Sequence, residues 1–345
     1  MDRRPARRRS AGGASPGRRR HGGRSRPSRR RAPAEAAGRG GDSLRAGSSD
    51  ARRRPARRRC PAVTDQPRVR IVADSACDLP ADIADRLDVT IVPSLVRFGT
   101  DEFQDRVELS VDDFWRRCAG ADELPQTAAP SGGVYAHAYR RLAESGATEI
   151  VAVMLSGELS ATIASARAGA DEAADAVAVR VVDSRGVSMA QGTLVMLAAQ
   201  LAADGATGAE IETAVTAAVG RTHLHAALDT LENLRKGGRI GAAASLLGSA
   251  LSIKPLIKIA DGVVVADGRQ RTRGRALSHL VSLVAERGDD IEHLSVLHAA
   301  CDDVDEFVAR VAPLVPDEVT VADVGPVVGA HAGIRAIGVA FRTRA

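Results

Sequence analysis

The sequence predicts an α/β fold in two parts, an N-terminal α/β domain with a parallel sheet and a C-terminal α+β domain with a mixed or antiparallel sheet. Short apolar runs alternate with helical patterns over residues 68–222, which is typical of a parallel sheet covered by helices on both faces. Two apolar runs flank Asp261-Gly262, a turn pair that favours an antiparallel hairpin. The length of 345 residues suits two domains, which we place at 67–222 and 223–345.

In the N-terminal domain, the expected strands are short apolar runs, and the expected helices lie between or after them. We expect strands at 69–74 ("VRIVAD"), 90–98 ("TIVPSLVRF"), 149–154 ("EIVAVM") and 178–183 ("AVRVVD"). We expect helices at 110–119, at 132–144, from about 160, at 187–203 and at 209–220. Strands that are apolar throughout are buried on both faces, so this domain should have a sheet in its interior.

The C-terminal domain has a different pattern. The hairpin is expected over 256–268, with further strands at 293–300 and 336–343 and a helix at 304–315. Residues 275–287 predict an amphipathic helix, because their large aliphatic residues recur three and four positions apart. Such a helix would cover one face of the sheet.

Residues 1–66 read as an Arg-rich tail that precedes the body of the protein. Residues 1–60 carry 21 Arg and four acidic residues, a net charge of +17, which leaves −12 for the rest of a chain whose total is +5. Without Phe, Tyr or Trp this segment cannot bury enough apolar surface to fold, so we expect disorder. Two interpretations stay open: contact with nucleic acid through phosphates, or a misassigned start, with the body beginning near Val63. Nucleic acid is the weaker interpretation, since no aromatic side chain could stack on bases.

Several classes of protein lack support in the sequence. The cysteines are scattered and form no metal or disulfide pattern, which suits a reducing cytoplasm. No apolar run is long enough to span a bilayer, and no phosphate-binding loop, dinucleotide fingerprint or nucleophile elbow is present. His223 and His225 share a strand face but have no further ligand at metal spacing. We therefore expect no metal and no cofactor.

Hydroxyl side chains gather where the apolar strand at 149–154 ends. Ser156, Ser160 and Thr162 stand at the start of the following helix. A helix N-terminus is a ready site for an anion, because its N–H groups lack partners. A simple helix cap at Ser160 would account for the same pattern.

Further polar groups lie at the ends of expected elements. Thr127 precedes the helix at 132–144, Arg239 follows a glycine pair, and His331 lies among glycines, while arginines cluster at 269–273. Hydroxyls, an imidazole and arginine are the groups that a buried carboxylate needs.

Asp74 and Asp78 follow the first strand and allow two interpretations. They could act as a general acid and base. They could also cap the strand end and the helix that begins near Pro80, and we favour capping.

The order of motifs resembles the DegV family over residues 68–345. The match is carried by "VADSACDLP", "QTAAPS", "LSGELSATIASA", "VVDS", "LRKGGRI", "IKPLI", the arginines at 269–275 and "GPVVGAHAG". The resemblance implies two α/β domains that clasp a long-chain fatty acid between them. It also implies a lipid-binding protein rather than an enzyme, since some members are the fatty-acid-binding subunit of bacterial fatty acid kinase and present the fatty acid to a separate kinase subunit.

The resemblance also assigns residues. Thr127, Ser160 and His331 match the positions that hold the fatty-acid carboxylate, and Arg239 and Arg271 match arginines near the mouth of the site, implicated in contact with the kinase or the phosphoryl group. The implied partners are therefore a long-chain fatty acid and a kinase catalytic subunit.

One motif leaves the function open. The loop "HAGIRA" at 331–336 departs from the "HTGPGA" pattern of the family, and this difference could change which ligand is chosen or how the protein couples to a kinase. The alternative function is a stand-alone acyl or phosphoryl transferase that uses His331 or Asp74.

Overall fold

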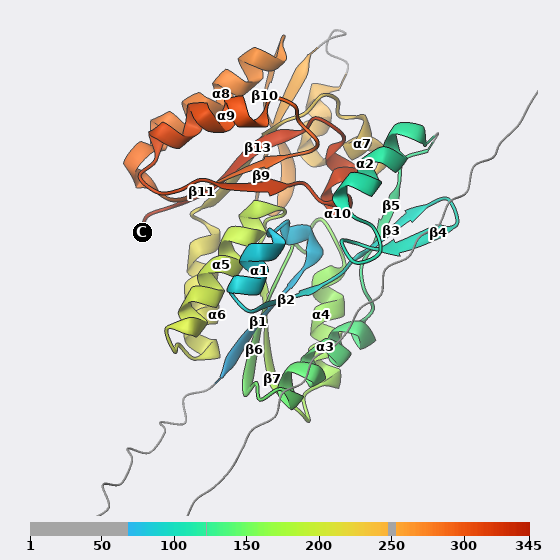
Figure 1. Ribbon diagram of the computed structural model, residues 1–345, viewed down its shortest axis with the longest axis vertical. Helices are drawn as coiled ribbons and strands as arrows, with labels where there is room; N and C mark the ends of the chain where they lie inside the picture. Colours follow the sequence, from blue (N-terminus) through green and yellow to red (C-terminus); the bar gives the residue numbers. More distant parts are fainter. Residues whose placement is uncertain (1–67, 122, 248–252) are drawn as a thin grey trace, which may run out of the picture. The chain divides into compact units, whose positions relative to one another are not determined.

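The computed structural model describes residues 68–121, 123–247 and 253–345 (Figure 1). They lie within one compact unit that spans 63–345. The predicted tail at 1–66 and both interpretations of it lie outside the described residues. The predicted fold class is confirmed, because a parallel sheet in the N-terminal half is joined to a mixed sheet in the C-terminal half. The boundary near residue 222 stays a prediction.

The first sheet is parallel and buried on both faces. Its strands, in spatial order, are β2 (Val89–Val92), β1 (Val69–Asp74), β6 (Glu149–Met154) and β7 (Ala178–Asp183). All neighbouring pairs run parallel. Helices α1 (Ala81–Arg86), α5 (Met189–Ala203) and α6 (Gly208–Val219) share a core with one face, and α3 (Gly132–Glu144) and α4 (Thr162–Glu172) with the other. The uninterrupted apolar runs of the sequence are therefore explained by burial on both sides.

The second sheet is mixed. Its spatial order is β10 (Val263–Gln270), β9 (Lys254–Ala260), β8 (Thr222–Ala227), β13 (Ile337–Thr343), β11 (Ile291–His298) and β12 (Thr320–Asp323). Only β11 and β12 run parallel; the other pairs are antiparallel. The hairpin β9–β10 turns at Asp261 and Gly262, both with positive φ, as a tight two-residue turn requires. Helices α8 (Arg273–Arg287) and α9 (Val304–Val311) cover one face (Figure 1).

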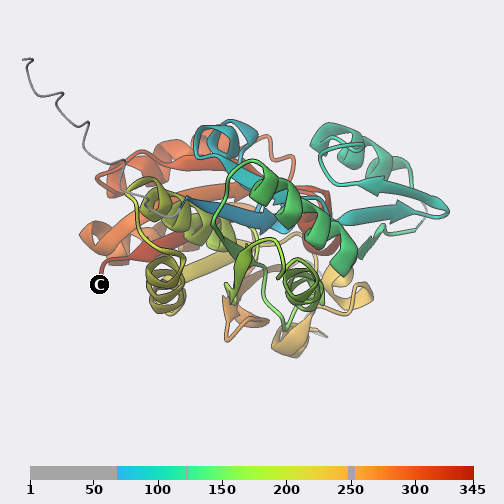
Figure 2. The same cartoon turned by 90° about the horizontal axis from the view of Figure 1, so that it is seen from below.

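The strand predicted at 90–98 is wrong in one respect, because the structure divides it between two sheets. Strand β2 ends at Val92, and β3 (Leu95–Phe98) joins a three-stranded antiparallel sheet, which lies to one side of the parallel sheet (Figure 2). Pro93 has no N–H to continue the ladder, and the N–H of Ser94 donates instead to Ser75 Oγ at 3.1 Å. The chain therefore leaves the parallel sheet at this point.

The helix predicted at 110–119 is confirmed as α2 (Val111–Gly120). Other elements were not predicted from the sequence, among them β4 (Asp101–Gln104), β5 (Gln126–Ala128), α7 (Glu232–Lys236) and α10 (Pro326–Ala332). The segment before residue 333, expected as a glycine-rich loop, is the helix α10 with Pro326 in its first turn. Proline suits that position, because the N–H that it lacks would have no helical partner there.

A buried polar junction at the end of β1 joins the two sheets. Asp74 accepts hydrogen bonds from the backbone N–H groups of Ala76 and Leu155 and from Gln191 Nε2, at 3.0, 2.9 and 2.9 Å. It caps a short 3₁₀ turn. Its oxygens therefore hold the end of β1 to β6 and α5, which agrees with the capping interpretation for the strand end. The predicted cap of the helix near Pro80 is wrong, because the N-cap of α1 is Pro80 itself and no side chain makes a cap hydrogen bond there.

Asp78 extends this junction to the C-terminal half. Its carboxylate accepts from Ser188 Oγ at 2.6 Å and from the N–H of Gly325 at 2.9 Å, and Arg106 donates to it at 3.1 Å. Gly325 is the N-cap of α10, so the start of that helix is fixed by a carboxylate from the turn that follows β1.

Two absences hold for residues 68–121, 123–247 and 253–345. None of their helices is both long and apolar enough to cross a membrane. None of their His, Cys, Asp and Glu side chains form a group of three or more that could hold a metal ion. Their cysteines, at positions 77, 118 and 301, are free.

Asp105 makes the stability of the junction around Asp74 and Asp78 depend on pH. Its side chain is buried, and burial raises the pKa of its carboxyl to about 7, although the Ser75 hydroxyl and the Arg106 guanidinium oppose the rise. A pKa above the ordinary value of 3.8 means that the folded state binds this proton more tightly than the unfolded chain. The resulting stability is present below about pH 4 and is lost as the pH rises through about 7.

We therefore expect Asp105→Asn to stabilise the protein at alkaline pH. The amide cannot ionise, so the free energy of unfolding near pH 8 should rise on the order of 3 kcal/mol relative to the parent, with little gain below about pH 4. Urea denaturation at both pH values measures the difference. Asp112→Asn, at an exposed position of α2, is the matched control. An equal effect of Asp105→Asn at both pH values would contradict the assignment.

Candidate functional site

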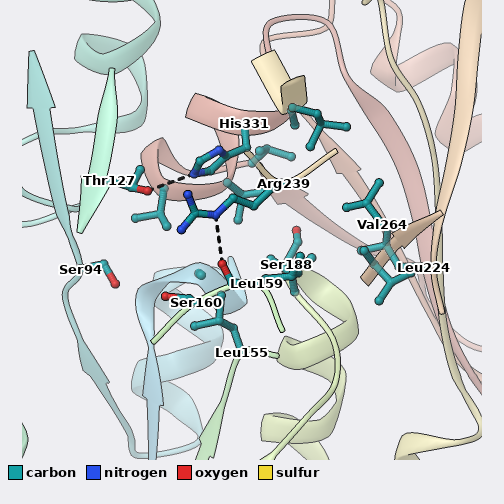
Figure 3. Close-up of a pocket in the computed structure, with 18 of the residues that line it drawn as sticks. Ser94, Thr127, Leu155, Leu159, Ser160, Ser188, Leu224, Arg239, Val264 and His331 are labelled. Atoms are coloured by element: carbon teal, nitrogen blue, oxygen red, sulfur yellow. Dashed lines mark hydrogen bonds between the residues drawn. The ribbon is translucent and has the colours of Figure 1, made fainter. Parts of the chain in front are cut away.

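A cavity of about 200 Å³ lies between the two sheets. The parallel half contributes the end of β6 and the start of α4, and the mixed sheet contributes β8, β9 and β10. Strand β5 and helix α10 close it at the side that carries the polar groups (Figure 3). The site is therefore built from segments that are far apart in the sequence.

Thr127 and His331 meet at one end of this cavity. Thr127 Oγ1 lies 3.0 Å from His331 Nε2, although the residues are 204 positions apart. Thr127 projects from β5, and His331 from the last turn of α10 (Figure 3). Two of the three residues that the sequence assigned to carboxylate binding are thus in direct contact.

His331 is neutral in this environment. Burial, together with the charge of Arg239, lowers the pKa of its imidazole to about 4. Its other ring nitrogen, Nδ1, has no hydrogen-bond partner among the described residues. The backbone of Gly237 packs so closely there that a Cβ atom at that residue would lie 2.3 Å from Nδ1.

Arg239 supplies the positive charge of the cavity. Its Nε donates to the backbone oxygen of Leu159 at 3.1 Å, and its Nη1 donates to that of Gly237 at 2.8 Å. These bonds hold the guanidinium in the cavity, where it forms no ion pair with an acid of the described chain. A cation among apolar side chains is stabilised by an anionic partner.

Ser160 lies beside the start of α4 and also lines the cavity. Its Oγ lies 2.9 Å from Thr162 Oγ1 and accepts from the N–H of Thr162 at 3.3 Å. The helix-cap interpretation of this serine is wrong, because the N-cap of α4 is Ala161 and no side chain makes a cap hydrogen bond there. Its position on the cavity wall is compatible with the predicted anion site. Ser156 does not line the cavity; it is buried and donates to the backbone oxygen of Gly262 at 2.7 Å.

The remaining wall is aliphatic. Its larger side chains are Leu155, Leu159, Val187, Leu224, Leu228, Leu234, Ile257, Ile259, Val264, Leu297, Val324, Val327 and Val328. No Phe, Tyr or Trp of the described chain lines it. Such a surface suits an alkyl chain, which has no need of directional contacts.

Two residues singled out from the sequence do not line this cavity. Asp74 is buried next to it, with its oxygens bonded to backbone and Gln191, and only its neighbour Ala76 reaches the wall. Arg271 is exposed in the turn between β10 and α8. Its predicted contact with a partner stays a prediction, as does that of Arg239, whose side chain is in the cavity.

Two hydroxyls in the cavity were not predicted. Ser94 lies where Pro93 breaks the apolar run, and a polar residue beside such a break was the available signal. Ser188 lies before α5 with a φ of 54°, and its hydroxyl is engaged by Asp78. That backbone conformation is not visible in the sequence.

Comparison with known sequences gives one family. A family model described as "Uncharacterised protein, DegV family" matches residues 68–344. A DegV domain-containing protein of Streptomyces coelicolor is 37% identical over 280 residues, which cover 80% of this chain and 99% of that protein.

Solved structures give the same result. A DegV family protein from Thermus thermophilus, described as binding fatty acid, superposes with a TM-score of 0.74 at 27% identity, covering 80% of this chain and 100% of that one. A protein from Eubacterium ventriosum, described as binding stearic acid, superposes with a TM-score of 0.74 at 25% identity, covering 79% and 98%.

We expect Gly237→Ala to displace His331. Gly237 has an ordinary helical φ of −76°, so alanine brings no backbone strain, but its Cβ would collide with the imidazole. The ring should move away from Thr127 into a more polar setting, and its pKa should return toward 6.5 from about 4. NMR titration of the histidine rings measures this shift.

Gly274→Ala is the matched control, since an added Cβ there meets nothing within 4 Å. An unchanged His331 titration in Gly237→Ala would show that the close packing does not hold the ring.

Proposed function

The chain belongs to the DegV family, and we propose that it binds a long-chain fatty acid in the cavity between its two sheets. The carboxylate lies at the end that carries Thr127, His331 and Arg239, and the alkyl chain lies along the aliphatic wall. The observation that carries this proposal is a single cation, without an acidic partner in the described chain, at the polar end of a cavity whose remaining wall is aliphatic. A fatty acid supplies both the missing anion and the apolar body.

The polar end can satisfy a carboxylate without adding further charge. Hydroxyls of Thr127 and Ser160 can donate to its oxygens, and the guanidinium of Arg239 offsets its charge. His331 is neutral, so it orients the Thr127 hydroxyl rather than contributing charge. An ionised carboxylate without such partners would be very costly to bury.

The aliphatic wall accounts for the affinity. Burial contributes about 0.8 kcal/mol per methylene, so a chain of sixteen carbons gains on the order of 10 kcal/mol before the costs of binding. The cavity of about 200 Å³ is smaller than the roughly 300–1,000 Å³ of typical ligand pockets. A long acyl chain therefore has to displace the wall side chains outward. The affinity for the fatty acid then depends on how far each of these side chains can move. The Thermus thermophilus and Eubacterium ventriosum proteins, described as binding fatty acid and stearic acid, support this ligand class.

We further propose that the protein presents the bound fatty acid to a separate kinase subunit in the cytoplasm. This extends the family resemblance and is supported by the absence of a phosphate-binding loop from the sequence. Arg271 and Ile334 are exposed on segments near the ends of α8 and α10, where a partner can reach them. The altered residues after His331 belong to the same region.

The stand-alone transferase is the second candidate, and two observations weigh against it. A nucleophile–base pair of Thr127 and His331 would need a group on Nδ1 to orient the base, and the described chain offers none. Asp74 is fully engaged by other donors and does not line the cavity. Turnover of ATP or an ester by the purified protein alone would favour this candidate instead.

We expect Thr127→Val and Ser160→Ala each to weaken fatty-acid binding by about 1–3 kcal/mol, the cost of leaving a buried charged acceptor without a donor. Displacement of a fluorescent fatty acid measures the affinity. Thr213→Val on α6 and Ser282→Ala on α8, both exposed, are the matched controls. Parent-like affinity in both cavity variants would place the carboxylate elsewhere.

We expect Arg271→Ala to separate binding from presentation. Because this side chain is exposed and lies outside the cavity wall, fatty-acid affinity should stay near the parent value. Formation of acyl phosphate with a cognate kinase and ATP should fall, because Arg is suited to bidentate contact with carboxylate or phosphate. Arg86→Ala, exposed at the end of α1, is the control. Equal loss of binding and product in Arg271→Ala would assign this residue to the binding site.

A further inference from the structure

A second cavity adjoins the first. It has a volume of about 420 Å³ and is bounded by the loop before α5, the end of α6 and strands β8 and β9. Its charged or ionisable wall residues are Arg185, His223, His225, Lys258, Asp261 and Arg287. In contrast to the aliphatic cavity, the lining of this second one includes several basic residues.

Leu224 and Ile259 are the two residues that line both cavities. In the antiparallel register of β8 and β9, Ala226 pairs with Ile257, and Leu224 and Ile259 lie two residues further along each strand, so they leave the sheet on the same face as that pair. Residues opposite one another in an antiparallel pair share a face of the sheet. Their side chains therefore form a shared wall between the two cavities.

This wall lies far from the polar end of the aliphatic cavity. Figure 3 shows Leu224 and Val264 on the side of the cavity opposite to Thr127 and Ser94. A fatty acid whose carboxylate lies at Thr127 thus directs its methyl end toward Leu224. The methyl end of such a fatty acid meets the wall formed by Leu224 and Ile259.

Lys258 lies on the other face of the sheet. It pairs with His225 in the register of β8 and β9, so its side chain points away from Ile259, and it lies 3.5 Å from Asp267. An alkyl chain that passed Leu224 and Ile259 would therefore not meet this side chain directly.

We propose that the Leu224–Ile259 pair is the end wall that sets the longest acyl chain this protein accepts. The inference rests on the proposed function, since it needs a fatty acid oriented by Thr127 and Arg239. A chain that fills the cavity up to this wall can add a methylene only by pushing Leu224 or Ile259 out of place. Overpacking of this kind is destabilising. Truncation of either residue opens the route into the second cavity.

Ile259→Ala tests the wall, and Ile257→Ala is its matched control. Both isoleucines lie on β9 and line the aliphatic cavity, but only Ile259 borders the second cavity. The affinity of each variant is measured for saturated acids from dodecanoic to docosanoic by displacement of a fluorescent fatty acid, after thermal melting has confirmed folding.

In Ile259→Ala the tightest-binding chain should become longer, with up to roughly a fourfold gain for each additional methylene that is buried. In Ile257→Ala the optimum should stay where the parent has it. The variants Leu224→Ala and Leu228→Ala repeat the comparison. Leu224 lies on β8 and lines both cavities, whereas Leu228, the control, directly follows β8 and lines only the aliphatic cavity.

Two results would overturn the proposal in distinguishable ways. If the parent binds fatty acids and the wall variants keep its chain-length optimum, the wall is refuted and the proposed function stands. If the parent binds none of the acids, the proposed function is wrong, and the proposal of an end wall is wrong as well.

Discussion

The site depends on a carboxylate that does not line it. Asp78, directly after the 3₁₀ turn that follows the first parallel strand, accepts hydrogen bonds from Ser188, Arg106 and the N–H of Gly325. Gly325 starts α10, and α10 carries His331 to Thr127. This buried junction ties the parallel half to the segment that carries His331, alongside the apolar core that the two halves share. Its cost is the burial of an ionisable group, whose pKa is raised to about 6 by desolvation.

Charge in the cavity is kept to a single cation. A protonated His331 would make two, but burial and the neighbouring Arg239 hold it neutral. In the proposed function, the carboxylate of a fatty acid supplies the anion that this guanidinium lacks within the described chain, which avoids the cost of an uncompensated buried charge.

The sequence predicted what local patterns encode. The apolar runs of β1, β6 and β7 and the turn at Asp261-Gly262 were sufficient for the fold class. Helix α10 was missed because its glycines resemble a loop, whereas Gly329 is required by close packing against Trp115, 2.8 Å from the position of a Cβ atom. The contact of Thr127 with His331, and the entry of Arg239 into the cavity, arise from the approach of distant segments, which no local pattern reports.

The junction at Asp78 also bears on how the protein folds. The hydrogen bond to Gly325 joins residues that are 247 positions apart. Strand β8 pairs with β13, the last strand of the chain, so this pair cannot form until β13 has been made. During synthesis the parallel half is complete first, with Leu155 and Leu159 at an edge that only later segments cover. Contacts between residues so far apart in the sequence form slowly. Until they form, the exposed apolar surface can aggregate. A nascent chain of this architecture is therefore a natural client for chaperones that hold exposed aliphatic surface until translation ends.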